Sequence, residues 1–217
     1  MKRAGIVLVL VIMAGCLQNG QSELTICCAG DSLMRPIPRR LGEMLKISKR
    51  KIKIRDWSRG GLSSQSYQAF FKRHYQSWRN TRPDFILIQL GTNDVRSLLQ
   101  KEYGIDDFKA NLKTIIKNFR RFRGSKYKRP KIFMASIPLF YVVSSPKERN
   151  RLIEERINPT IEETAREENV IFVDNYSVLY NRTHLYFPDG VHPNSRGVKA
   201  LAKNWLFRMR SELRKSF

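Results

Sequence analysis

The chain has 217 residues, about the length of one ordinary domain. Its 41% hydrophobic and 28% charged content excludes an intrinsically disordered chain, and the lack of long apolar runs beyond the amino terminus excludes a multi-span membrane protein. The 41 Lys and Arg residues outnumber the 19 Asp and Glu residues, and the resulting net charge of +22 attracts polyanions such as anionic polysaccharide, anionic lipid or nucleic acid.

Residues 1–22 have the pattern of a signal peptide: two basic residues, an apolar run over 4–14, and then Met13-Ala14-Gly15-Cys16. Small residues before a cysteine resemble the cleavage box of bacterial lipoproteins, in which Leu usually stands where this chain has Met. The pattern therefore predicts that Cys16 is lipidated and becomes the first residue of the mature protein. The folded domain over 23–217 is then expected outside the cytoplasm, anchored in the cell envelope. The alternative is an ordinary secretory signal that is cut a few residues further on.

Five short runs predict β-strands. Four of them are apolar almost throughout, which is typical of strands buried on both faces of a parallel sheet. The second run alternates basic and apolar residues, and this alternation predicts an edge strand with one face in water. The predicted strands cover residues 24–28, 51–55, 85–90, 131–136 and 170–174.

Helical patterns separate the strands and close the chain. The predicted helices cover residues 36–45, 65–78, 106–122, 147–168 and 195–213, and Pro159 interrupts the fourth of them. Strands that alternate with helices predict an α/β fold, a three-layer α/β/α sandwich around a five-stranded parallel sheet in the flavodoxin-like order 2-1-3-4-5. In such sheets the ligand lies beyond the carboxyl ends of the strands, so the loops after the strands are where functional residues are expected.

The loops after the first two predicted strands each carry a motif. Gly30-Asp31-Ser32-Leu33 places a serine hydroxyl on a tight turn whose amides can bind an oxyanion, although alone it also fits a helix N-cap. Gly60 and Gly61 free the backbone for close approach to a ligand, although alone they indicate only a turn.

Two more motifs follow further along the chain. Gly91-Thr92-Asn93-Asp94 comes after the third strand, and the Asn93 amide can donate a hydrogen bond to a developing negative charge, although Asn and Asp also form ordinary turns. Near the carboxyl terminus, Asp189 and His192 are three residues apart on one loop, so the carboxylate can orient the imidazole as a general base.

Together the four motifs resemble the blocks of the SGNH hydrolase superfamily, also called GDSL esterases. The Ser, Gly, Asn and His of those blocks match Ser32, Gly60 or Gly61, Asn93 and His192. The resemblance extends over nearly all of the chain after the signal peptide. The second block matches least well, because the double glycine leaves open which residue supplies the oxyanion amide.

The resemblance implies the SGNH fold and a carboxylic ester hydrolase. Ser32 is then the nucleophile, His192 the general base and Asp189 the residue that orients it, and an acyl-enzyme forms on Ser32. The backbone amides of Ser32 and Gly61 and the side chain of Asn93 are the expected oxyanion donors.

The residues next to these blocks are expected to support the site. Gly30 and Gly60 flank the predicted nucleophile and oxyanion donor, and Asp31 and Asp94 are expected to accept hydrogen bonds that shape the loops. The reaction needs no metal or other cofactor. Cys27 and Cys28 predict buried thiols, because they are adjacent in an apolar run and offer neither a disulfide framework nor a metal site.

The substrate is predicted less closely. Location outside the cytoplasm and a cationic surface favour O-acetyl esters on a cell-envelope carbohydrate, with lipid esters or thioesters as an alternative. An O-acyltransferase on an envelope polysaccharide is a second alternative, because a sugar hydroxyl can intercept the same acyl-enzyme, and a binding protein that has lost the chemistry is a third. The apolar segment 138–143 either lines the crevice or packs against the body of the domain.

Basic residues concentrate in segments 46–55 and 117–131. These segments either hold an anionic polymer or membrane surface or form an ordinary solvated face. No nucleic-acid-binding motif accompanies the charge, so no specific nucleic-acid partner is predicted. The sequence makes no prediction of oligomeric state.

Overall fold

The computed structural model describes residues 23–46, 51–141 and 146–216. The predicted signal peptide, including Cys16, lies outside these ranges. Within them, no helix is both long and apolar enough to cross a membrane. All described helices and strands lie from Leu24 onward, and so do both hydrophobic cores, so the chain from residue 17 contains the whole described fold.

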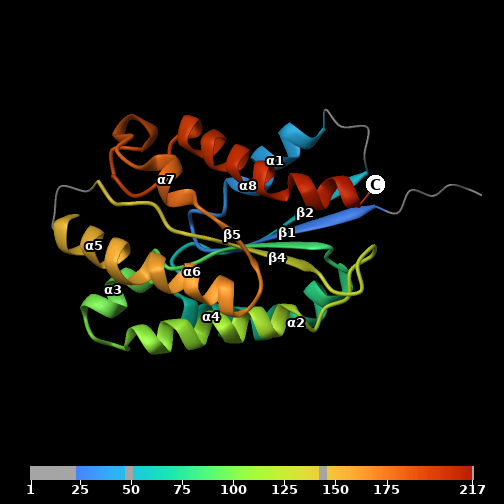
Figure 1. Ribbon diagram of the computed structural model, residues 1–217, viewed down its shortest axis with the longest axis horizontal. Coiled ribbons are helices and arrows are strands. Elements are labelled where there is room, and N and C mark those ends of the chain that lie inside the picture. The colour runs from blue at the N-terminus through green and yellow to red at the C-terminus, as the bar shows by residue number, and fades with distance from the viewer. Residues whose placement is uncertain (1–22, 47–50, 142–145, 217) are drawn as a thin grey trace, which may run out of the picture.

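Five parallel strands form one sheet in the order β2-β1-β3-β4-β5, which confirms the predicted topology (Figure 1). The predicted edge strand is also confirmed, because β2 pairs only with β1 in the described sheet and most of its residues are partly or fully exposed. The strands are β1 (Leu24–Gly30), β2 (Ile52–Ser58), β3 (Phe85–Gln89), β4 (Lys131–Ala135) and β5 (Ile171–Val173).

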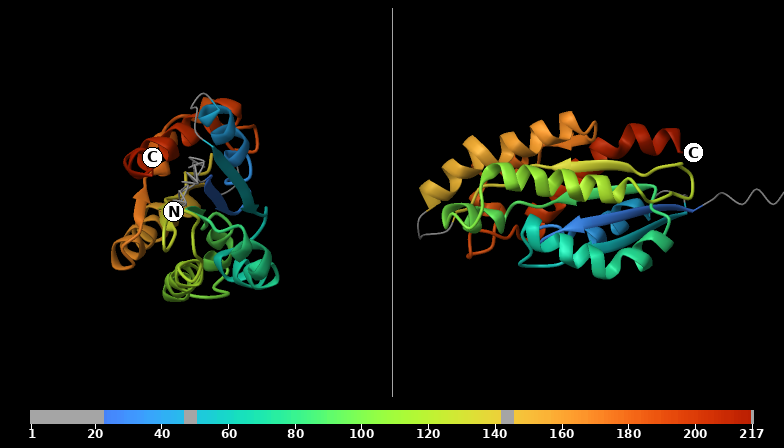
Figure 2. Two further views of the ribbon diagram at one scale, coloured as in Figure 1. Left: turned by 90° about the vertical axis from the view of Figure 1, so that its right-hand side faces the viewer. Right: turned by 90° about the horizontal axis from the view of Figure 1, so that it is seen from below.

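Helices cover both faces of the sheet (Figure 2). One face carries α1 (Ile37–Leu45), α7 (Asn175–Leu179) and α8 (Ser195–Lys215). The other carries α2 (Ser64–Asn80), α4 (Ile105–Phe119) and α6 (Asn158–Glu167). Figure 1 shows the two layers above and below the sheet, which is the predicted sandwich.

The sheet separates two hydrophobic cores. Successive β1 residues point to opposite faces, so Cys28 joins the core under α1 and α8 while Cys27 joins the core under α2 and α4. Both thiols are buried and free, as predicted. The core under α2 and α4 is rich in aromatic side chains, and in it the rings of Trp57 and Trp78 stack with centroids 4.6 Å apart. Burial of each such ring contributes roughly 2–3 kcal/mol to folding.

The predicted helix over 147–168 is interrupted, although not by a simple kink. It consists of α5 (Pro146–Leu152), a π-helical turn over Ile153–Ile157, and α6. Pro159 is the second residue of α6 and cannot donate a backbone hydrogen bond into the preceding turn. The wider π-turn accommodates this missing bond.

Two short helices and one 3-10 turn fall where the sequence predicted loops. They are α3 (Asp94–Leu99), α7, and the turn over Thr183–Leu185. Each is six residues or shorter, which is too short to give a readable 3.6-residue period.

Candidate active site

Ser32, His192 and Asp189 form one hydrogen-bonded chain at the carboxyl ends of the strands. The His192 Nε2 atom lies 2.9 Å from Ser32 Oγ, and its Nδ1 atom lies 2.8 Å from Asp189 Oδ2. Ser32 and His192, which make the first of these contacts, are 160 positions apart in the sequence. This is the geometry in which a carboxylate orients an imidazole and the imidazole takes a proton from a hydroxyl.

The loop of Asp189 and His192 is held by its own backbone. Asp189 Oδ1 accepts hydrogen bonds from the amides of Val191 and His192, each at 2.9 Å. Partial burial works against ionisation of Asp189, but these amides and the imidazole outweigh it and hold the pKa of the carboxyl below its usual range. Asp189 is therefore a carboxylate at neutral pH, as the orienting role requires.

The turn that carries Ser32 needs a glycine before it. A Cβ atom at Gly30 would come within 2.3 Å of the carbonyl oxygen of Gln89 on the neighbouring strand, so a larger residue would push β1 and β3 apart. The Asp31 amide donates to the same carbonyl at 3.2 Å, and the Asp31 side chain accepts from the Leu33 amide at 2.9 Å. The sequence-predicted tight turn is thus built by close approach of the backbone to β3.

The second and third sequence motifs bring Gly60, Gly61 and Asn93 near Ser32. A Cβ atom at Gly60 would contact Ser32 Cβ at 3.6 Å, and Gly61 has a positive φ of 79° that favours glycine. The Asn93 Nδ2 group donates one hydrogen to the Leu62 carbonyl at 3.0 Å, so its second hydrogen is available to a ligand. Asn93 and Gly61 line the same cavity.

Asp31 and Asp94 are the flanking carboxylates, and both accept hydrogen bonds within the loops of the site. Asp94 accepts from Ser64 and from the Tyr103 hydroxyl, which ties the start of α2 to the loop after β3. Burial raises the pKa of both carboxyls, and that of Asp31 reaches about 7. Asp31 Oδ2 lies beside Thr92 without a well-aligned hydrogen bond.

Two cavities lie near the proposed catalytic residues, and Ser32 and His192 are among the lining residues of the second but not of the first. The first has a volume of about 540 Å³, and its lining includes Gly61, Asn93, Phe140, Arg96 and Arg149. The second, about 430 Å³, is more apolar, and its lining includes Ser32, His192, Pro36, Phe187 and Val198.

Residues 142 and 143 of the apolar segment 138–143 lie outside the described residues, and Phe140 in the described part has both of the roles that the sequence allowed. Phe140 is buried against the body of the domain and also forms part of the wall of the first cavity. The Asn150 side chain exchanges two hydrogen bonds with the Phe140 backbone, at 2.8 and 2.7 Å, and Asn158 does the same for Ile137. These two asparagines of α5 and α6 fix the wall, and no motif in the sequence indicated them.

The described residues contain no group of three or more His, Cys, Asp or Glu side chains that could hold a metal ion. The expectation that the reaction needs no metal or cofactor stays a prediction.

Comparison with known proteins agrees with the fold. A family model of the GDSL-like lipase/acylhydrolase family matches residues 12–200. Among solved structures, a GDSL-like lipase from Parabacteroides merdae superposes with a TM-score of 0.71 at 18% identity, covering 87% of this chain and 96% of that one. The R55A mutant of Axe2, an acetyl-xylooligosaccharide esterase from Geobacillus stearothermophilus, superposes with a TM-score of 0.69 at 18% identity, covering 86% and 94%.

Two curated relatives share detectable sequence similarity. An acetylxylan esterase of Xylanibacter ruminicola is 28% identical over 144 residues, which is 58% of this chain and 29% of that protein. A multidomain esterase of Ruminococcus flavefaciens is 31% identical over 137 residues, which is 62% of this chain and 16% of that protein. The chain thus matches less than a third of the length of either relative.

A parallel 2-1-3-4-5 sheet with serine, glycine, asparagine and histidine blocks at its carboxyl end defines an SGNH-type hydrolase. The chain belongs to the GDSL-like lipase/acylhydrolase family, whose model matches most of its length.

Proposed function

We propose that this protein is a serine esterase that removes acetyl groups from a carbohydrate through an acyl-enzyme on Ser32. The observation that carries the proposal is the continuous hydrogen-bonded chain from Asp189 through His192 to Ser32 Oγ, with distances of 2.8 and 2.9 Å. The amide of Asn93 and the backbone of Gly61 face the same cavity beside this chain.

In the proposed reaction, Ser32 Oγ attacks the ester carbonyl and His192 Nε2 accepts its proton. Asp189 holds the imidazole in the tautomer that keeps Nε2 free to accept. The backbone amides of Ser32 and Gly61 and the side chain of Asn93 donate to the oxyanion that forms on the carbonyl oxygen. His192 then returns the proton to the leaving alcohol, and water releases acetate by the same steps in reverse. No metal or organic cofactor takes part.

An acetylated carbohydrate is the substrate that the surroundings of the site favour. The wide cavity next to Asn93 carries Arg96 and Arg149 as well as backbone and hydroxyl groups, so it offers hydrogen-bond donors to a sugar. The relatives named as acetylxylan or acetyl-xylooligosaccharide esterases support the same class.

The second cavity supports one alternative. Pro36, Phe187 and Val198 give it an apolar wall directly beside Ser32, which would suit a longer acyl chain of a lipid ester or thioester. Transfer of the acetyl group to a sugar hydroxyl instead of water needs no different residue, so only analysis of the products separates an acyltransferase from an esterase.

The place of action that we propose is the cell envelope. The predicted signal peptide over residues 1–22 supports this location, and lipidation of Cys16 would anchor the domain there. Radiolabelled fatty acid incorporated by the wild-type chain and not by Cys16→Ser would support the anchor.

The test of the proposed function compares the protein from residue 17 onward with its Ser32→Ala variant on 4-nitrophenyl acetate, butyrate and octanoate. We expect hydrolysis to be fastest on the acetate and to fall at least about 10³-fold in the variant. A clear preference for octanoate would move the proposal to a lipid esterase. Equal rates for the two proteins would remove Ser32 as the nucleophile.

A further inference from the structure

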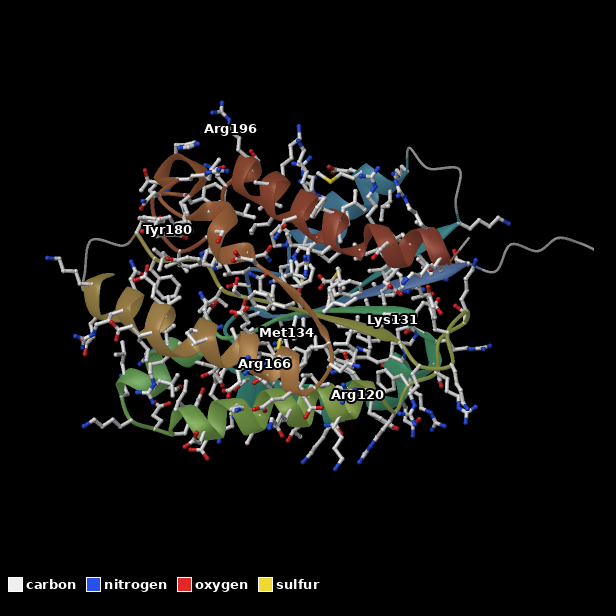
Figure 3. All side chains as sticks on the ribbon, viewed as in Figure 1. Arg120, Lys131, Met134, Arg166, Tyr180 and Arg196 are labelled. Carbon is white, nitrogen blue, oxygen red and sulfur yellow. The ribbon has the colours of Figure 1, made fainter. Side chains whose placement is uncertain are left out.

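The amino ends of the strands, opposite the proposed active site, carry a cluster of exposed basic residues. We define the basic end as the exposed residues Arg82, Arg121, Arg123, Lys128, Arg129 and Arg214. None of the six forms an ion pair with a residue that the structure describes. They come from the loop before β3, the loop before β4 and the last turn of α8. Figure 3 labels their neighbours Arg120 and Lys131 at this end of the molecule.

The acidic residues around the basic end are already engaged. Glu212 pairs with Lys215 at 2.8 Å and with Lys131 at 3.6 Å, and Glu168 pairs with Arg120 at 2.6 Å. Glu212 and Glu168 are therefore paired with other cations, and the six residues of the basic end remain available to an external anion.

The loop that carries most of these cations is fixed to the sheet. Asp84 is fully buried, and its carboxylate accepts hydrogen bonds from the Lys126 amide at 2.6 Å and the Ser125 hydroxyl at 2.6 Å. The same carboxylate accepts from the Thr25 amide in β1 at 3.0 Å. A Cβ atom at Gly124 would come within 2.5 Å of Asp84 Oδ1, so the loop needs glycine there to approach so closely.

The position of the chain's amino-terminal part distinguishes between the polyanions that could bind here. The carbonyl of Glu23, directly before β1, accepts a hydrogen bond from the Ser125 hydroxyl in the loop before β4, so the chain enters the domain at the basic end. Residues 16 to 23 reach at most about 25 Å when fully extended. A lipid on Cys16 would therefore hold the basic end, and no other end, against the membrane.

We propose that the basic end is a docking surface for an anionic lipid membrane. The orientation part of this proposal rests on the predicted lipid anchor, whereas the binding part rests on the described cations alone. Docking through the basic end would leave Ser32 facing away from the membrane, about 20 Å further along the seven-residue strand β1.

The test uses the protein from residue 17 onward, which lacks both the apolar run and any lipid. Its sedimentation is measured with vesicles of phosphatidylcholine alone and with mixed phosphatidylcholine and phosphatidylglycerol vesicles at physiological salt. A basic-end variant replaces Arg121, Arg123, Lys128 and Arg129 with Gln. A control variant replaces four exposed cations elsewhere, Lys72, Arg73, Arg196 and Lys199, with Gln.

We expect binding to the mixed vesicles only, because each basic side chain near an anionic membrane strengthens binding roughly fivefold. The basic-end variant should bind at least about tenfold more weakly, whereas the control variant should stay within about threefold of the wild type. Equal losses in the two variants would show that the whole +22 surface acts together, and this result would overturn the proposal. The proposal would also be overturned if the wild-type protein did not bind the mixed vesicles but bound soluble polygalacturonate.

Hydrolysis of 4-nitrophenyl acetate is measured on the same three proteins. Unchanged rates would show that the variants fold and that docking is separate from catalysis. The docking proposal can therefore fail while the esterase proposal stands, and the reverse.

Discussion

Two buried carboxylates stand at opposite ends of the sheet, and their surroundings differ. Asp84, at the amino ends of the strands, accepts hydrogen bonds from three backbone amides and one hydroxyl. Asp31, beside Ser32 at the carboxyl ends, accepts a hydrogen bond from the Leu33 amide, and its second oxygen lies beside Thr92 without a well-aligned hydrogen bond. Both side chains are fully shielded from solvent.

The difference is that the hydrogen bonds of Asp84 compensate for its burial, whereas those of Asp31 do not. A buried carboxylate whose lone pairs are filled stabilises the fold, whereas one left short of donors carries a desolvation cost. The raised pKa of Asp31, about 7, reflects this cost. We therefore expect changes to the proposed catalytic residues at the carboxyl ends to alter turnover, changes to Asp84 at the amino ends to lower stability, and changes to Asp31 to alter how stability depends on pH.

The largest expected effect is on turnover at the carboxyl ends. His192→Ala should lower kcat on 4-nitrophenyl acetate at least about 10³-fold, because Ser32 loses the base that accepts its proton. The double variant with Ser32→Ala should be no slower than either single variant, since the two residues act as one unit. Urea unfolding should give nearly the same free energy as the wild type, because His192 is partly exposed. A large loss of stability would contradict the separation of the two ends.

Asn93→Ala should lower kcat by about 10²–10³-fold, the usual effect of removing one oxyanion donor. The change in KM should be small if the amide acts mainly on the transition state. With 4-nitrophenyl acetate as substrate, Arg96→Gln is a matched control, because Arg96 lines the same cavity, bonds to Gln100 and is proposed to contact the sugar, which this ester lacks. A similar loss of kcat in both variants would indicate a general disturbance of the cavity instead of a lost oxyanion donor.

The sequence predicted the sheet and the loops of the site because both depend on local signals. Buried parallel strands are short apolar runs, and the rule that ligands lie at their carboxyl ends places Ser32, Gly61 and Asn93 at one edge. The spacing of Asp189 and His192 predicts their contact within a single loop. The structure adds the 2.9 Å contact between His192 and Ser32 and the presence of Gly61 and Asn93 in one cavity.

The sequence did not predict the contacts that depend on residues far apart in the chain. The hydrogen bonds of Asp84 to the loop before β4 join residues more than 40 positions apart. Nothing in the local pattern distinguishes Asp84 from an ordinary turn residue. Asn150 and Asn158 were missed for a related reason: asparagines inside a helical pattern read as solvated positions. The short helices α3 and α7 were missed because they complete fewer than two turns.

At the amino ends, Asp84→Ala should lower the free energy of unfolding by about 3 kcal/mol or more. The change leaves the amides of Thr25, Lys126 and Tyr127 without their acceptor. Turnover on 4-nitrophenyl acetate at 25 °C should stay close to that of the wild type. Glu162→Ala, at an exposed position in α6, should change stability by less than about 0.5 kcal/mol. A loss of turnover in the folded Asp84 variant would show that the two ends are coupled.

The smallest expected effect is a pH-dependent one at Asp31. The folded protein holds the proton of Asp31 up to about pH 7, whereas the unfolded chain releases it near its ordinary pKa of about 4. Between these values the folded state binds more protons than the unfolded state, so this group lowers stability as pH rises and has its full destabilising effect above pH 7. Asp31→Asn keeps an acceptor for the Leu33 amide and brings a donor toward Thr92, and it removes the ionisation.

Urea unfolding at pH 5 and pH 8 checks this expectation. The Asn variant should gain stability relative to the wild type on going from pH 5 to pH 8, by an amount on the order of 2 kcal/mol. Asp94→Asn is the informative control, because burial also raises the pKa of Asp94 but that carboxylate accepts from Ser64 and Tyr103. The loss of these bonds should make the Asp94 variant less stable than the wild type at both pH values. If Asp31→Asn and Asp94→Asn changed stability alike, the number of hydrogen bonds that each carboxylate accepts would not explain the effect of its burial on stability.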